Sequence, residues 1–349
     1  MAILYVTEQG SSLTKQGDRL VVMKQGKAIH WAHAFKVEQV ALMGNISLSP
    51  AVVGFLLEQG IDTVFLTYFG RYRGRLISQF GKNIELRRQQ FKKIDDLEFK
   101  LKQARSCVKG KINNCRVFLR RRNQEFNNPD ITKVVHRLRR LASQVDSTES
   151  IESLMGVEGA SAAAYFGSFG LLIKNSDVVF SGRNRRPPKD PVNVLLSLGY
   201  TLLANAIHTQ VNIVGLDPYL GCLHSAEYGR PSLVLDLMEE FRPALVDSTV
   251  IYAVNTKVIK HTDFYKPDER EPAAFDFAEK EPLREEYPIL LRHEGMKKFV
   301  SLFEDRLNRK TIHPARGLRL TYRNILLEQV RMFARSITDE SAYIPFTIR

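Results

Sequence analysis

Three carboxylates lie close together in a short apolar segment of this 349-residue chain. Pro231 and Ser232 are typical of a helix start. On the helix that follows, Asp236, Glu239 and Glu240 are three and four residues apart, so they share one face. Like charges at this spacing repel one another, and a bound divalent cation relieves that repulsion. The segment therefore favours a metal site.

A histidine precedes the acidic helix in the same stretch, Gly215–Pro243. His224 together with carboxylates is a ligand set suited to Mn²⁺ or Mg²⁺. A single histidine beside Cys222 and Leu223 is, however, more often a hydrogen-bonded structural residue. A general-base role is a further alternative, and the sequence does not separate it from metal ligation.

Glu158 is a fourth candidate carboxylate. It lies in M-G-V-E-G-A-S-A-A-A-Y-F, between Gly156 and Gly159 and among small or apolar residues. Burying a charge among such neighbours is costly unless the charge is paired. A functional role, a salt bridge to an arginine and a surface position on a frayed helix all remain open from the residues alone.

The positive charge of the chain is concentrated in one block. The net charge is +13, and residues 71–140 hold 21 Lys and Arg against 6 Asp and Glu. Arg71, Arg73 and Arg75 open this block, and Arg120-Arg121-Arg122 and Arg139-Arg140 follow. Such a stripe is typical of proteins that bind a phosphate backbone. An ordinary solvated face usually mixes both signs of charge, which makes it the less favoured interpretation.

A second basic segment precedes the helix predicted to start at Asp190-Pro191. Arg183, Arg185, Arg186 and Lys189 gather there. Side-chain cations and the free N–H groups of a helix start both favour phosphate. We therefore expect this loop to contact phosphate groups.

Hydrophobic periodicity divides the chain into two domains. Short runs rich in β-branched and aromatic residues predict strands at Ile3–Thr7, Arg19–Lys24, Gln39–Met43, Thr63–Thr67 and Arg75–Ile77. From about residue 84 the period becomes helical, with Asp130, Ser150 and Asp190 as predicted N-caps and with final helices at 287–307 and 318–336. Residues 261–288 are predicted to form a loop or hairpin. The fold class is thus multidomain α+β: a small β-rich, sandwich-like domain at 1–83, followed by a larger all-α domain at 84–349.

Composition indicates a protein of a reducing compartment. Cys107, Cys115 and Cys222 form no C-x-x-C pair. The sequence has no signal peptide pattern and no run of about 18 uninterrupted apolar residues. We expect a cytoplasmic protein with no membrane span.

Several long motifs together resemble one known family. They are V-E-G-A, R-P-P-x-D-P-V-N-x-L-L-S-x-G-Y, G-L-D-P-Y-x-G-x-L-H and R-P-S-L-x-L-D-L-M-E-E-F-R-P, and the likeness extends from the first strand to the last helices. This combination resembles the CRISPR-associated integrase of spacer acquisition. The resemblance implies a prokaryotic, metal-dependent DNA endonuclease and integrase whose helical domain is catalytic.

The resemblance also implies roles for individual residues. Glu158, His224 and Glu239 would hold the divalent ion, Mg²⁺ or Mn²⁺, and Asp236 would be a further catalytic acid near it. Glu240 is the ambiguous neighbour, which we interpret as salt-bridged or solvated. A 3′-OH of a short duplex would attack at the edge of a CRISPR repeat, so neither Ser225 nor Cys222 has a covalent role.

The implied partners are double-stranded DNA, a second copy of the chain and a small CRISPR-associated protein. Two homodimers bridged by that small protein would form a heterohexamer, and the β-rich domain would supply the dimer contact and touch DNA. Two alternatives remain: a stand-alone repair nuclease for branched DNA, and a DNA-binding scaffold without catalysis.

Overall fold

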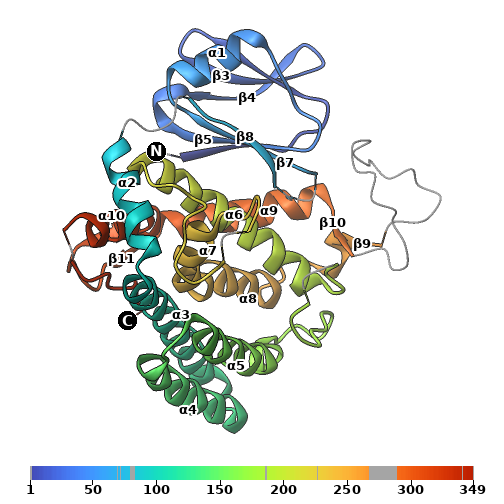
Figure 1. Cartoon of the computed structure of the whole chain (residues 1–349). Coiled ribbons are helices and arrows are strands. Elements are labelled where there is room, and N and C mark those ends of the chain that lie inside the picture. Colours follow the sequence, from blue (N-terminus) through green and yellow to red (C-terminus); the bar gives the residue numbers. More distant parts are fainter. Residues whose placement is uncertain are drawn as a thin grey trace. The chain divides into compact units, whose positions relative to one another are not determined.

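The chain folds into two compact units in a computed structural model (Figure 1). The structure describes residues 2–68, 70, 72–78, 83–184, 187–225, 227–266, 289–339 and 341–348. Unit 1 comprises residues 1–80 and 264–297, and unit 2 comprises residues 81–263 and 298–349. The helices within the described ranges are all too short or too polar to cross a membrane.

Unit 1 contains two four-stranded sheets that share a core. Their strands are β1 (Ala2–Val6), β2 (Ser12–Gln16), β3 (Arg19–Lys24), β4 (Lys27–His33), β5 (Val37–Met43), β6 (Ser47–Leu48), β7 (Asp62–Leu66) and β8 (Tyr72–Leu76), with helix α1 (Pro50–Glu58). The strand orders are β1-β5-β7-β8 and β4-β3-β2-β6. Strands β1, β5 and β7 run parallel, and β8 is antiparallel to β7. Leu13, Val40 and Leu56 are fully buried in the shared core, which confirms the predicted β-rich, sandwich-like N-terminal region.

Each of the five predicted strands is present, and among β1–β8 the pattern misses β2, β4 and the two-residue β6. Five of the seven residues of β4 are exposed and the other two half-buried, because it forms the edge of its sheet. An edge strand with little buried surface carries no alternation of apolar and polar residues, and this alternation is the signal by which strands are recognised.

Residues 264–297 belong to unit 1, whereas the sequence predicts them within the helical domain. Strand β9 (Phe264–Tyr265) pairs antiparallel with β10 (Leu290–Leu291), and residues 267–288 lie outside the described part of the chain. Glu8 contacts His293 and Lys297, each at 3.3 Å. Hydrogen bonds from Lys24 and Lys297 lower the pKa of Glu8 to about 2. Pairs between residues so far apart in the sequence have no local pattern, so the sequence does not predict that residues 264–297 join unit 1.

Unit 2 is mainly helical, as predicted. Its helices are α2 (Ile84–Asp95), α3 (Leu97–Phe126), α4 (Pro129–Gln144), α5 (Ile151–Phe169), α6 (Pro191–Val214), α7 (Ser232–Met238), α8 (Ser248–Asn255), the larger part of α9 (His293–Asn308) and α10 (Tyr322–Thr338). A short hairpin, β11 (Lys310–Ile312) and β12 (Arg319–Thr321), joins the last two. Between α7 and α8 the backbone changes to a 3-10 turn, η4 (Glu239–Phe241), and then to π-helix, η5 (Arg242–Asp247).

The 30-residue helix α3 packs against α4, α5 and η4 and so links the candidate site elements. Ser150 caps α5, and Asp190 caps α6 ahead of Pro191, as predicted. Asn128, not Asp130, caps α4, because Pro129 takes the first helical position and Asp130 then falls within the first turn. Helix α9 begins at His293 rather than at 287, since β10 occupies residues 290–291.

Candidate metal centre and nucleic-acid interface

A lysine lies between two of the predicted metal ligands. The Lys111 ammonium of α3 forms an ion pair with Glu158 of α5 and lies 2.6 Å from Glu239 Oε2 of η4. Only 9% of the Lys111 side chain, 4% of Glu239 and 25% of Glu158 is exposed. The packing of α3 against both α5 and η4 thus brings the two carboxylates to one cation.

Glu239 is held in its ionised form by positive neighbours. Burial opposes its ionisation, but the charges of Arg242 and Lys111 outweigh burial and lower its pKa to about 2. Arg242 Nη2 lies 3.0 Å from Glu239 Oε1, and the charge of His224 contributes to the lowering. Lys111 stays charged for the reciprocal reason: burial disfavours the ammonium, but Glu239 and Glu158 raise its pKa.

Asp236 organises the loop that carries His224. Its carboxylate accepts hydrogen bonds from the backbone N–H groups of Cys222, Leu223 (2.9 Å) and His224 (3.0 Å). Asp236 Oδ1 also lies 2.6 Å from His224 Nδ1. With Nδ1 directed at this carboxylate, Nε2 is the ring nitrogen positioned for a ligand, an arrangement common among metal-binding histidines. Asp236 is therefore a positioning residue in this geometry.

Glycine is required at position 221 by the close approach of these groups. A Cβ there would lie 2.6 Å from the backbone carbon of Ser232 and 2.7 Å from Asp236 Oδ2. Gly221 thus allows the loop to pass the start of α7, so that the three N–H groups reach the carboxylate.

Glu240 is buried and has no ion pair with any residue in the described ranges, so its interpretation as salt-bridged or solvated is wrong. Its carboxyl group is buried and accepts hydrogen bonds of 2.9 Å from Gln329, Tyr343 and the Phe346 backbone. Burial raises its pKa to about 8. Because α7 ends at Met238, the shared helical face predicted for the three acids does not continue to Glu240. Each acid instead meets a different set of partners.

The donor set suits a divalent cation, but the side chains are not gathered around one point. Across the ranges that the structure describes, no three His, Cys, Asp or Glu side chains form a group able to hold a metal ion. Two carboxylates nevertheless converge on one cation, the Lys111 ammonium, which lies 2.6 Å from the buried Glu239 Oε2. The chemistry of Glu158, Glu239 and His224 therefore fits Mn²⁺ or Mg²⁺, provided that the Lys111 ammonium moves.

The structure separates the predicted DNA-binding arginines into different groups. Arg71, Arg185 and Arg186 lie outside the described residues. Arg73 on β8 is exposed, whereas Arg75 lies 3.2 Å from Asp62 with only 5% of its side chain exposed. A guanidinium buried in this ion pair is not available to DNA, so the assignment of Arg75 is wrong.

The loop before α6 uses Arg183 as an internal anchor. Its guanidinium donates to Asn193 Oδ1 (2.7 Å) and Ser197 Oγ (3.3 Å), both on α6, and stacks over Tyr200. Arg183 therefore shapes the loop rather than presenting a free charge. Lys189 is exposed, and its backbone N–H donates to Asn184 Oδ1.

An arginine cluster on α3 and α4 is a stronger candidate for phosphate contact. Burial and the charges of Arg120 and Arg139 lower the pKa of Arg116, so three guanidiniums lie near one another. Arg120 and Arg139 are exposed. Like charges gathered in this way favour an anionic ligand. The sequence indicates the basic block but not that Arg116 on α3 and Arg139 on α4 lie near enough for their charges to interact.

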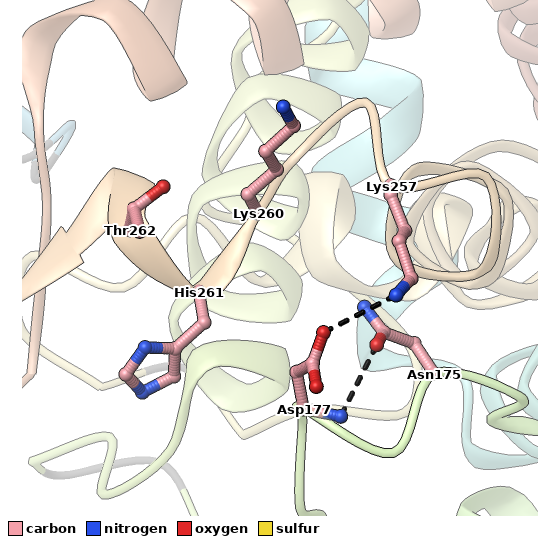
Figure 2. A pocket seen from close by; sticks show the side chains of 6 residues that line it. All are labelled: Asn175, Asp177, Lys257, Lys260, His261 and Thr262. Carbon is pink, nitrogen blue, oxygen red and sulfur yellow. Dashed lines mark hydrogen bonds and ion pairs between the residues drawn. The ribbon is translucent and has the colours of Figure 1, made fainter.

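A separate polar hollow of about 530 Å³ lies elsewhere in unit 2. Asn175, Asp177, Lys257, Lys260, His261 and Thr262 line it (Figure 2). Lys257 Nζ lies 3.3 Å from Asp177 Oδ2, and the Asp177 backbone N–H donates to Asn175 Oδ1 (Figure 2). None of the predicted catalytic residues lines this hollow, so the candidate chemistry lies at Lys111 and its partners instead.

Comparisons with known proteins agree with this fold and these residues. The profile of the family "CRISPR associated protein Cas1" matches residues 4–305. A Thermus thermophilus protein named CRISPR-associated endonuclease Cas1 3 is 36% identical and covers 100% of this chain and 98% of its own. A Rhodospirillum rubrum relative, CRISPR-associated endonuclease Cas1 2, is 33% identical over 98% of this chain and 97% of its own.

Solved structures extend the likeness. A chain of a Cas6-RT-Cas1–Cas2 complex superposes with a TM-score of 0.82 at 26% identity; the match covers 100% of this chain and 36% of that longer one. A casposase bound to integration product (TM-score 0.82, 22% identity; 99% of this chain and 93% of its own) and a Cas1 protein from Thermotoga maritima (0.80, 22%; 98% and 99%) share the fold.

The names of the relatives place the chain, with its β-rich unit and its helical unit, among CRISPR-associated endonucleases. Within that class, the chain belongs to the Cas1 family.

We expect Asp236→Ala to damage both stability and activity. The change leaves the N–H groups of residues 222–224 without their acceptor, and each unsatisfied buried group costs about 1–3 kcal/mol. It also releases His224 from its orientation. Thermal unfolding should shift downward and metal-dependent cleavage should be lost. Glu227→Ala, on the same loop but exposed and bonded to Arg230, should retain both. Equal behaviour of the two variants would contradict the positioning role.

We expect Glu240→Gln to flatten the pH dependence of stability. The pKa of Glu240 is raised to about 8 in the folded chain, so folding retains a proton that the unfolded chain releases above about pH 4.5. Wild-type stability should therefore fall between pH 6 and 8, by at most about 1.4 kcal/mol per pH unit from this group. Calorimetric melting across this range should show a smaller decline for the variant; parallel curves would contradict the assignment.

Proposed function

We propose that this chain is the integrase of CRISPR adaptation and a metal-dependent DNA endonuclease, with Glu158, His224 and Glu239 as its metal ligands. The observation that carries the ligand assignment is the convergence of Glu158 and Glu239 on one cation, beside a histidine oriented by Asp236. Family membership supports the DNA chemistry, since the relatives are named CRISPR-associated endonucleases.

A bound Mg²⁺ or Mn²⁺ would neutralise charge that develops on the scissile phosphate. Glu158 and Glu239 would hold it through carboxylate oxygens, and His224 through Nε2. Asp236 keeps the imidazole directed toward the site through Nδ1. Arg242 keeps Glu239 ionised, so this ligand does not have to lose a proton at neutral pH.

The other contribution of the protein is to position the reacting groups, because phosphoryl transfer depends on their alignment more than on a protein nucleophile. A DNA 3′-OH or water would attack the phosphate, and the oxygen on its far side would leave. The arginines of α3 and α4 would hold the duplex through its phosphates without reading bases. Cys222 is unsuited to a covalent role: it is buried, and burial raises its pKa well above the ordinary value.

We infer that the partners are double-stranded DNA, a second copy of the chain and Cas2, assembled as a heterohexamer. The Cas6-RT-Cas1–Cas2 complex supports the Cas2 partner, and the casposase bound to its integration product shows the same fold in a DNA complex. The β-rich domain would supply the dimer contact and part of the DNA contact.

Strand joining tests the proposed reaction. Purified protein, its Cas2 partner, a short duplex with free 3′ ends and a supercoiled plasmid carrying a repeat are incubated with Mn²⁺, Mg²⁺ or EDTA. We expect metal-dependent joining by wild type, and a loss of at least about 100-fold in Glu158→Ala, His224→Ala and Glu239→Ala, since each removes a ligand. Glu227→Ala serves as the control.

Each outcome selects one activity. Joining that persists in EDTA or in the ligand variants would contradict the proposed centre. Cutting without joining would instead identify a nuclease for branched DNA. Tight DNA binding with neither activity would identify a scaffold.

DNA binding tests the arginine cluster separately. We expect the double variant Arg120→Ala, Arg139→Ala to bind duplex DNA more weakly and to lower the slope of log K against log salt by about 2, because each arginine removed leaves one phosphate without its cation. The double variant Lys257→Ala, Arg331→Ala removes two positive charges elsewhere in unit 2 and should leave that slope unchanged. The same slope in both double variants would show that the cluster is an ordinary solvated face.

A further inference from the structure

We propose that Lys111 competes with the divalent ion for Glu158 and Glu239, and thereby sets the metal affinity of the site. This inference rests on the ligand set proposed above. It assigns a distinct role to a residue that the motifs of the sequence do not single out: Lys111 is an internal counter-cation that the metal must displace.

The position of the ammonium is the first argument. Lys111 Nζ contacts a carboxylate oxygen of Glu158 and, at 2.6 Å, one of Glu239. Two oxygens that share one ammonium at these distances enclose the space that a cation would occupy between them. Mg²⁺ requires its oxygen ligands at about 2.1 Å, so ion and ammonium cannot share that space.

Burial is the second argument. The side chains of Lys111 and Glu239 are 9% and 4% exposed, so neither charge is well hydrated. Removing one partner of a buried pair is strongly destabilising, because the other charge is left uncompensated. A cation between the two acids therefore stabilises the folded chain. Lys111 supplies one that is covalently tethered, and a divalent ion can replace it.

The charge balance gives the exchange a consequence for DNA. Leaving His224 aside, the carboxylates of residues 158, 236 and 239 and the cations of residues 111 and 242 give a formal sum of one negative charge. A divalent ion reverses the sign to one positive charge, which attracts phosphate. Because Lys111 stays attached to α3, its charge remains near the site after displacement.

The test compares the Mn²⁺ affinity of the variant Lys111→Met with that of wild type. The free ion is measured by electron paramagnetic resonance. Methionine keeps the length of the side chain and removes its charge. We expect the dissociation constant to fall at least tenfold relative to wild type. Without metal the variant should melt at a lower temperature, and Mn²⁺ should raise its melting temperature more than that of wild type. Lys109→Met, which removes an exposed pair with Asp146 on the same helix, should match wild type in both measurements.

The outcomes separate this inference from the proposed function. If His224→Ala binds Mn²⁺ as wild type does, the ligand set is wrong and the inference falls with it. If His224→Ala loses affinity while Lys111→Met binds no more tightly than wild type, the ligand set stands and the competition is refuted.

A measurement on the wild-type chain covers the case in which Lys111→Met does not fold. Amine labelling followed by mass spectrometry compares the reactivity of Lys111 with that of Lys109, with and without Mg²⁺. We expect Mg²⁺ to raise the reactivity of Lys111 severalfold, because a displaced amine leaves its buried ion pairs, and to leave Lys109 unchanged. An unchanged ratio would overturn the proposal.

Discussion

The need of buried carboxylates for a counter-cation is the constraint on which the helical unit depends. Glu239 is almost fully buried and remains ionised because Lys111 and Arg242 contact it from two sides. Lys111 comes from α3 and Glu158 from α5, so one ion-pair cluster joins three elements that are far apart in the sequence. The residues proposed to bind metal thus also hold the helices together.

Asp236, Glu239 and Glu240 are close in sequence, but the residues around each of them give it a different role. Asp236 accepts backbone N–H groups and orients His224. Glu239 meets cations, which lower its pKa, whereas the donors to Glu240 in the described part of the chain are neutral, and burial raises its pKa. The backbone changes from α-helix to 3-10 and then π-helix at residues 239–247, so the side chains of Asp236, Glu239 and Glu240 point toward different partners. One short segment thereby supplies a positioning residue, a candidate ligand and an anchor for the C-terminal residues 343–346.

The sequence predicts the elements of this fold better than their partners. The five strands with apolar runs and the capped helices α5 and α6 follow from local signals, as does the grouping of His224 with an acidic helix. The exposed edge strand β4 has no such signal. The buried pair of Arg75 with Asp62 and the bridge from Lys111 to Glu158 and Glu239 depend on tertiary packing, which periodicity does not encode. The partners of Glu240 are not predictable from local sequence for the same reason, since its hydrogen-bond donors lie 89 to 106 residues further along the chain.

The central claim is that one divalent ion binds between Glu158, Glu239 and His224, in the space that Lys111 Nζ now occupies. Anomalous diffraction from crystals of the full chain grown with Mn²⁺ tests it most directly. The account predicts a single strong peak at about 2.1–2.2 Å from an oxygen of each glutamate and from His224 Nε2, with the Lys111 ammonium moved away. A peak elsewhere, or Lys111 still bridging Glu158 and Glu239 in a crystal that holds Mn²⁺, would contradict it.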